Sequence, residues 1–175
     1  MTLDWTKELR AKALTIVSGR EVSRFMLKRK LLEWCTKRPS KFSADVEADR
    51  AFENECIDVL LNEFEASGFV SDHRFAEIYL RTRGEQNYGP RRIAYELAQK
   101  GVPSSLVSEL LENADQDWIG VALRAKRKKF GRLSTCSLKD RSKVIRHLMA
   151  RGFEMGDALA ALENDALDED PSSLF

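Results

Sequence analysis

The residues in this sequence that are best suited to chemistry are positively charged side chains, and the chemistry they offer is the binding of anions. Between Trp118 and Arg151 there are 11 lysines and arginines and one acid, Asp140. Lysine and arginine neutralise phosphates and release their counterions, so such a segment is typical of a surface that faces a polyanion. The rest of the sequence balances this segment, because the whole chain has a formal net charge of +1.

Part of this charge lies on one face of a predicted helix. Lys139, Lys143 and Arg146 share that face, opposite Val144 and Leu148. If repeated units stack with a constant rotation, cations from the corresponding helices elsewhere form one row. The candidates for binding a polyanion are Lys28, Arg29, Arg81, Arg83, Arg91, Arg92, Lys126, Arg127, Lys128, Lys129, Arg132, Lys139, Lys143 and Arg146. Tyr88, in a predicted turn, is a candidate for stacking on a base or filling a protein groove.

Other kinds of chemistry find little support. His73 and His147 are far apart and have no cysteine or carboxylate at metal-ligand spacing. The phosphate-loop pattern G-x-x-x-x-G-K-[ST] and the nucleophile pattern G-x-S-x-G are both missing from the sequence. We therefore expect no catalytic residue, no metal and no cofactor, and a function based on binding.

The elements that must position the cations are helices arranged in a repeat. Apolar residues recur at helical spacing nearly everywhere, and alternation of period two is essentially missing. The segment 93–102, IAYELAQKGV, recurs 51 residues later as VIRHLMARGF, so that Gly101 corresponds to Gly152 as a predicted helix end. Such a period is the signature of stacked units that cannot bury their apolar faces alone.

The predicted fold is all-α, with three tandem three-helix units that resemble helix-turn-helix motifs and form an elongated, curved body. Three boundaries are specific expectations. Ser18 is expected to cap the second helix, the third helix to start at Ala51 after an extended loop, and the last helix to end at Leu162. The predicted divisions are a first unit (1–70, with its loop at 36–50), a second unit (71–114), a third unit (115–163) and an acidic, disordered tail (164–175).

The compartment follows from what the sequence contains. Its three cysteines have no paired spacing, and the odd number leaves one over in any disulfide scheme. No apolar run reaches membrane-spanning length, and the first residues do not resemble a signal peptide. We therefore expect a cytoplasmic protein with no membrane contact.

Four segments carry a resemblance to a known family. They are residues 20–27 (REVSRFML), 68–76 (GFVSDHRFA), 89–102 (GPRRIAYELAQKGV) and 148–153 (LMARGF). In their order and spacing they resemble the RecX family of regulatory proteins, which modulate the RecA recombinase, and the likeness covers roughly residues 10–163. The sequence departs from the common pattern between Trp34 and Ala51, where its connection is longer and charged.

The resemblance implies a bacterial cytoplasmic protein that binds RecA or the RecA–DNA filament. It also implies inhibition of filament growth, ATPase activity and strand exchange, with a role in recombination, DNA repair and the SOS response. The family has no catalytic residues to transfer to this sequence. Binding of single- or double-stranded DNA with low sequence specificity, by a monomer, is expected.

Two other functions remain open at this point. The first is a stand-alone DNA-binding regulator in which a helix of one unit reads base edges in the major groove. The second is an adaptor that binds proteins alone. Steep salt dependence with no sequence preference favours the filament modulator over the regulator.

Overall fold

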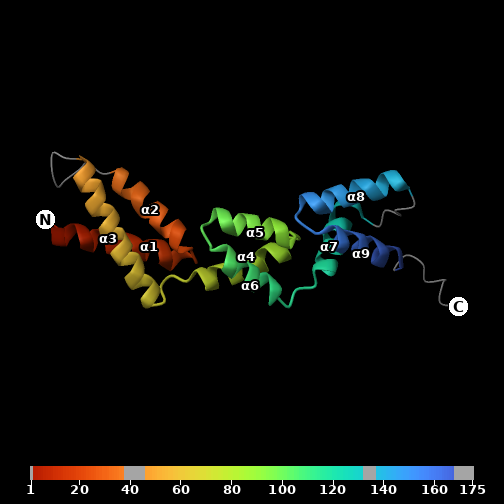
Figure 1. The fold of residues 1–175 in the computed structure, drawn as a ribbon, viewed down its shortest axis with the longest axis horizontal. Coiled ribbons are helices and arrows are strands. Elements are labelled where there is room, and N and C mark those ends of the chain that lie inside the picture. The colour runs from red at the N-terminus through yellow and green to blue at the C-terminus, as the bar shows by residue number, and fades with distance from the viewer. Residues whose placement is uncertain (1, 38–45, 132–136, 168–175) are drawn as a thin grey trace. The chain divides into compact units, whose positions relative to one another are not determined.

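The computed structural model describes residues 2–37, 46–131 and 137–167, and the regular secondary structure in these ranges is α-helix, with no strand (Figure 1). The nine helices of the described ranges are α1 (Thr2–Gly19), α2 (Arg24–Thr36), α3 (Val46–Ala66), α4 (Asp72–Glu85), α5 (Pro90–Gln99), α6 (Ser104–Glu112), α7 (Trp118–Phe130), α8 (Leu138–Ala150) and α9 (Met155–Leu167). This order confirms the predicted all-α fold of tandem three-helix units.

The helices belong to two compact units that do not follow the repeat boundaries. Unit 1 contains Met1–Ala76 together with Lys100–Pro103, and unit 2 contains Glu77–Gln99 together with Ser104–Phe175. The core of unit 1 is formed where α1, α2 and α3 pack together. Its central side chains, fully buried, include Leu9, Leu27, Leu31, Ile57, Leu61 and Phe64.

Unit 2 holds the last five helices and most of α4. In it α5 packs on α6, and α7, α8 and α9 pack on one another around a core that includes Val121, Val144, Leu148 and Phe153. Val144 and Leu148 were the expected inward residues of α8, and the structure buries both. The opposite face of α8 is therefore left for polar side chains.

Three predicted element boundaries were wrong. Ser18 lies inside α1, where its hydroxyl donates to the Thr15 carbonyl, and Ser23 caps α2 instead by accepting a hydrogen bond from the Met26 amide. Helix α3 begins at Val46, so part of the expected loop is helical, and residues 38–45 of that loop lie outside the described residues. Helix α9 continues to Leu167 because Asp165, expected in the tail, is buried in an ion pair.

The residues that precede the two repeat glycines, Lys100 and Arg151, each accept a hydrogen bond from the start of an earlier helix, within one unit in each case. In unit 2 the Gly89 amide at the start of α5 donates to the Arg151 carbonyl at 2.9 Å. In unit 1 the Ser23 hydroxyl at the start of α2 donates to the Lys100 carbonyl at 2.5 Å. The residue that follows each carbonyl is a glycine with positive φ, +77° at Gly101 and +91° at Gly152. A repeated helix end thus packs on a repeated helix start.

We expect the substitution Gly152→Ala to destabilise unit 2 by about 2–4 kcal/mol. The left-handed backbone disfavours any Cβ, and this Cβ would clash with the backbone of Arg92. Chemical denaturation measures the effect. Gly156→Ala is the matched control, because Gly156 lies in α9 with nothing within 4 Å, so alanine there should be neutral or slightly stabilising. Equal stability of the two variants would contradict the close packing at Gly152.

Candidate polyanion-binding surface

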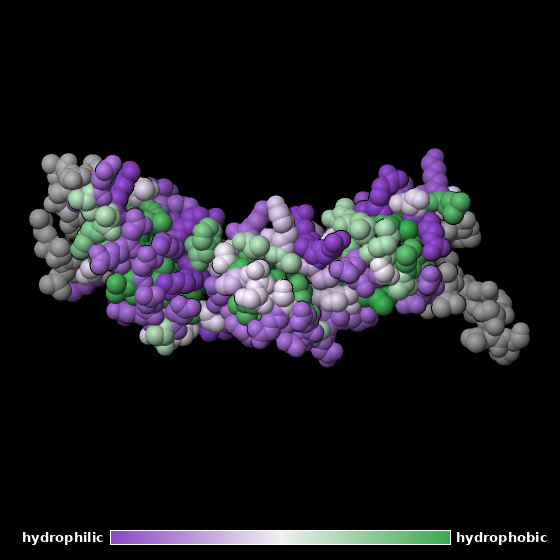
Figure 2. Space-filling model, in the orientation of Figure 1, coloured by the Kyte–Doolittle hydropathy of each residue, from purple (hydrophilic) through white to green (hydrophobic). Residues whose placement is uncertain are grey.

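The third repeat presents a cluster of exposed cations on α8 and the end of α7. We call this cluster the basic face, and it consists of Lys128, Lys129, Lys139, Lys143 and Arg146. Helical periodicity places Lys139, Lys143 and Arg146 opposite the buried Val144 and Leu148. Figure 2 shows strongly hydrophilic side chains projecting from the outward side of α8.

An aromatic ring brings the two helices of the basic face together. The ammonium groups of Lys129 from α7 and Lys143 from α8 lie 5.6 and 5.9 Å from the centroid of the Phe130 ring. A ring face attracts cations, so it holds both ammonium groups near one another without neutralising them. Among the described residues, Lys128, Lys139, Lys143 and Arg146 form no ion pair with a carboxylate, so their charge is available to a ligand.

His147 contacts Lys129 of this cluster, and the positive charge around it affects the pKa of its imidazole. Its Nδ1 lies 3.2 Å from the Lys129 ammonium, its ring meets Phe130 edge-on, and its buried Nε2 has no hydrogen-bond partner among the described residues. Burial, followed by the charges of Lys129 and Arg151, lowers the pKa of His147 below its ordinary 6.5. The imidazole is therefore neutral at neutral pH, and its Nδ1 can accept a hydrogen bond from the Lys129 ammonium.

This lowered pKa predicts a loss of stability in mild acid. As the pH falls below about 6.5, the unfolded chain binds a proton at this position before the folded chain does, so the free energy of unfolding decreases. We expect the His147→Gln variant to lose less stability than the unmodified chain between pH 7 and pH 5. Denaturant titrations at several pH values measure this, and identical pH profiles for the two proteins would contradict it.

Two of the predicted binding residues, Lys126 and Arg127, bind a buried carboxylate instead. Lys126 is 1% exposed and forms a buried ion pair with Asp165 of α9. Arg127, partly exposed, binds the same carboxylate through Nε at 2.7 Å. The expectation that Lys126 contacts a polyanion was therefore wrong, because its ammonium points into the packed core beside α9.

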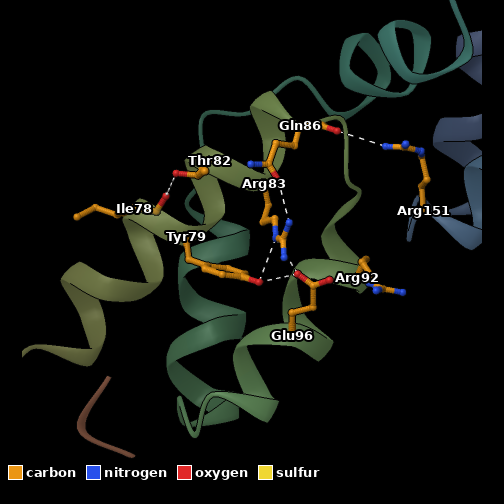
Figure 3. A network of polar contacts seen from close by, with 8 residues as sticks. All are labelled: Ile78, Tyr79, Thr82, Arg83, Gln86, Arg92, Glu96 and Arg151. Carbon is orange, nitrogen blue, oxygen red and sulfur yellow. Dashed lines mark hydrogen bonds and ion pairs between the residues drawn. The ribbon is translucent and has the colours of Figure 1, made fainter. Parts of the chain in front are cut away.

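Two arginines of the second repeat, Arg83 and Arg92, are held by a polar network (Figure 3). Arg83 donates to the Tyr79 hydroxyl at 3.0 Å and lies 2.8 Å from Glu96, which also pairs with Arg92 at 2.7 Å. Burial raises the pKa of Glu96, but hydrogen bonds from Tyr79 and Arg92 and the charges of Arg83 and Arg92 outweigh burial, so the pKa lies below the usual value. Arg83 and Arg92 thus have a carboxylate partner already.

Tyr88, the stacking candidate, is part of this framework. Its ring lies 5.1 Å from the Arg83 guanidinium and 5.0 Å from that of Arg151. Arg151 also donates to the carbonyls of Gln86 and Asn87 at 3.2 and 2.9 Å. These contacts join the second and third repeats inside unit 2, which makes Tyr88 a packing residue in this structure.

The remaining candidates are scattered. Lys28 pairs with Asp58 at 2.6 Å in unit 1, and Arg29 lies 3.8 Å from Glu33 on the same helix. Arg81 and Arg91 are exposed in unit 2, and Arg132 lies outside the described residues. The single row of cations from all three repeats stays a prediction. The basic face gathers five of the candidates: Lys128, Lys129, Lys139, Lys143 and Arg146.

Sequence reasoning missed three residues that organise these contacts: Glu96, Arg151 and Asp165. For Arg151 the available signal was its correspondence with Lys100 in the repeat, because each of these two residues precedes a repeat glycine. Glu96 follows Arg92 by four residues, which is ion-pair spacing on a helix. Asp165 carried no signal, since an acid near a run of acids is usually solvated.

Neither a metal site nor a membrane-spanning helix is found in the described ranges. No group of three or more histidine, cysteine, aspartate or glutamate side chains there could hold a metal ion. None of the helices in those ranges is long and apolar enough to cross a membrane.

The fold and the basic face together define a class: an all-α protein of tandem three-helix repeats whose surface carries a cationic cluster. Residues 71–111 match the second three-helix domain of RecX, and residues 115–162 match the third. The chain is 34% identical over 142 residues to the regulatory protein RecX of Legionella pneumophila, covering 81% of this chain and 84% of that protein. It therefore belongs to the RecX family of regulatory proteins.

Other comparisons agree with this assignment. The chain is 33% identical over 167 residues to the regulatory protein RecX of Neisseria meningitidis serogroup B, covering 94% of this chain and 97% of that protein. The crystal structure of RecX from Lactobacillus salivarius superposes with a TM-score of 0.74 at 19% identity, covering 94% of this chain and 99% of that one. At that identity the superposition supports the fold alone.

Proposed function

We propose that this chain acts in the bacterial cytoplasm by binding RecA, or the RecA–single-stranded DNA filament, and mostly inhibits filament growth, ATP hydrolysis and strand exchange. Membership of a family of regulatory proteins supports a regulatory role. The observation that carries the proposal is the basic face, because three of its cations lie on one helix face with no carboxylate partner among the described residues. It binds phosphate or an acidic filament surface without sequence preference.

Inhibition in this scheme needs no chemical step. A protein that occupies phosphates or an acidic surface on the filament blocks the addition of the next RecA subunit or the contact between subunits. Binding of this kind is dominated by charge, so it weakens steeply as salt rises. Single- and double-stranded nucleic acids are both bound, because both carry phosphates.

The alternative, a stand-alone regulator that reads duplex DNA, is less well supported. A recognition helix contacts base edges with its N-terminal residues. In unit 2 the start of α5 is covered, since the Gly89 and Arg91 amides donate to the Arg151 and Gly152 carbonyls. The third helices of the second and third repeats, α6 and α9, contain no lysine or arginine with which to approach phosphates.

The proposal is tested by adding the purified chain to RecA filaments on single-stranded DNA and following ATP hydrolysis and strand exchange. We expect both rates to fall with increasing protein, and the effect to weaken as salt is raised. Unchanged rates at several-fold molar excess over RecA would overturn the proposal. Sequence-selective duplex binding that survives high salt would favour the regulator instead.

A further inference from the structure

Unit 1 has two hollows beside α1. The first has a volume of about 310 Å³ and lies between α1 and α3, and Thr6 and Arg10 form part of its wall. The second, of about 530 Å³, lies between the last turns of α1 and the link from α3 to α4, and Leu14 and Ser18 form part of its wall. These four residues are spaced by four, so they share one face of α1. The two hollows therefore follow one another along that face, and together we call them the α1 groove.

Exposed apolar side chains gather in the α1 groove. Eight large hydrophobic side chains are exposed among the described residues, and three of them line this groove: Leu14, Val59 and Phe69, which are 39%, 55% and 50% exposed. The ring of Phe69 lies 5.3 Å from the ring of the buried Phe64, which holds it in place at the surface. Single exposed apolar residues are ordinary, whereas several on one face are typical of a contact surface. The groove thus offers an apolar site in each hollow.

The charges in the groove are balanced except for one carboxylate. In the first hollow Arg10 pairs with Glu63 at 2.6 Å, and in the second Arg74 pairs with Glu21 at the same distance. Glu55 also lines the first hollow, where it is exposed and forms no ion pair with any residue that the structure describes. The charge available to a ligand in the groove is therefore negative.

Helix α3, which forms one wall, strengthens this negative character. It contains seven acids and a single base, Arg50. Burial, followed by the charge of Glu55, raises the pKa of the Cys56 thiol, so this side chain stays protonated and adds to the apolar wall. Phosphates would be repelled by the carboxylates, so nucleic acid does not suit the groove. A protein segment with basic and apolar side chains matches both its charge and its apolar walls.

We propose that the α1 groove binds a basic segment of the protein partner, with one apolar side chain of that segment in each hollow. This inference rests on the proposed function, in which the partner is RecA. From Thr6 to Ser18 helix α1 rises about 18 Å, which about six extended residues can span. A segment so short binds weakly by itself, but a weak contact is reinforced when the basic face of the same chain is also bound.

The first test removes apolar side chains from the groove in the full chain, with Leu14→Ser and Val59→Ser together. The matched control is Ile78→Ser with Met155→Ser, because these side chains are exposed to a similar extent, 37% and 49%, and belong to unit 2. We expect the groove variant to bind RecA without DNA about tenfold more weakly, from the loss of two apolar contacts. Its affinity for a single-stranded oligonucleotide should equal that of the control. Fluorescence anisotropy measures both affinities.

The second test changes charge alone and leaves the apolar walls intact. Glu55→Lys should weaken RecA binding about fivefold at low salt, and the effect should fade at high salt, where exposed charges are screened. The control is Glu109→Lys, an exposed position on α6 where the change in net charge is the same. Equal RecA affinities for these two variants at low salt would overturn the charge match between the groove and its ligand.

A third test uses a synthetic probe and does not depend on RecA. A helical peptide of leucine and lysine is added to the full chain and compared with a peptide that has glutamate in place of lysine. We expect the lysine peptide to shift the backbone amide resonances of Arg10, Leu14 and Val59 in NMR spectra, and the glutamate peptide to leave them unchanged. Equal shifts with both peptides, or no shift with either, would overturn the proposed ligand.

The outcomes separate this inference from the proposed function. Equal RecA affinity for the Leu14→Ser, Val59→Ser variant and its control overturns the groove as the RecA contact and leaves the proposed function standing. Shifts in the groove caused by the lysine peptide, in a chain that binds neither RecA nor DNA, support the groove and overturn the proposed function. Groove resonances that move on dilution of the chain alone place a second copy there and overturn binding of a partner.

Discussion

Replacing Asp165 by asparagine is expected to lower the free energy of unfolding of unit 2 by about 3–5 kcal/mol, the cost of removing one partner from a buried ion pair. Asp165 and Lys126 are each 1% exposed, so the amide would leave a buried ammonium without its counter-charge. It would also release Arg127, which binds the other carboxylate oxygen. Because whole domains are stable by only about 5–15 kcal/mol, the variant should unfold at a much lower denaturant concentration.

Two further variants keep this prediction testable. The double substitution Lys126→Met with Asp165→Leu removes both buried charges and should recover most of the stability, because apolar pairs of similar volume often replace buried ion pairs without loss. Glu163→Gln on the same helix affects only an exposed pair and should change stability by less than about 0.5 kcal/mol. A single Asp165→Asn change as mild as Glu163→Gln would show that the buried pair does not hold α9.

Reversing the three aligned charges of α8 should remove the activity proposed for this chain. With Lys139→Glu, Lys143→Glu and Arg146→Glu we expect the affinity for single-stranded DNA at low salt to fall by at least roughly 100-fold. Losing each cation at an anionic surface costs close to a factor of five, and each added carboxylate also repels phosphate. Inhibition of RecA-dependent ATP hydrolysis should be lost in parallel. All three side chains are exposed and lie opposite the core, so the fold should be retained.

The control must carry the same change in net charge. Lys7, Arg20 and Lys37 are exposed on unit 1, and their reversal to glutamate alters the total charge equally while leaving the basic face intact. We expect this variant to inhibit RecA nearly as well as the unmodified chain. Equal loss of inhibition in both triple variants would mean that net charge matters and the basic face does not.

The fold was largely predictable from the sequence because its main determinant is local. The apolar spacing predicted that Val144 and Leu148 lie on the side of α8 that packs into the core. It also predicted that Lys139, Lys143 and Arg146 lie on the exposed side. Helix ends were less predictable. Ser18 and Ser23 both precede helical patterns, and the choice between them depends on tertiary contacts, because the Ser23 hydroxyl also donates to Lys100 far along the chain.

The candidate site was predictable as a charged region but not residue by residue. A run such as Lys126 to Lys129 places its members on different sides of a helix, so one of them must face the core. Which one is buried depends on whether the core offers a counter-charge, and Asp165 lies 39 residues away in the sequence. Arg83 and Arg92 were likewise bound by Glu96, a pairing that depends partly on how α4 packs near α5.

The most direct test of the basic face is the salt dependence of single-stranded DNA binding. The logarithm of the binding constant should fall linearly with the logarithm of salt concentration, by about 0.7 for each phosphate contacted. If Lys139, Lys143 and Arg146 each contact a phosphate, replacing all three with glutamine should make that slope shallower by about 2. Identical slopes for the glutamine variant and the unmodified chain would contradict the assignment of α8 as the surface that binds the polyanion.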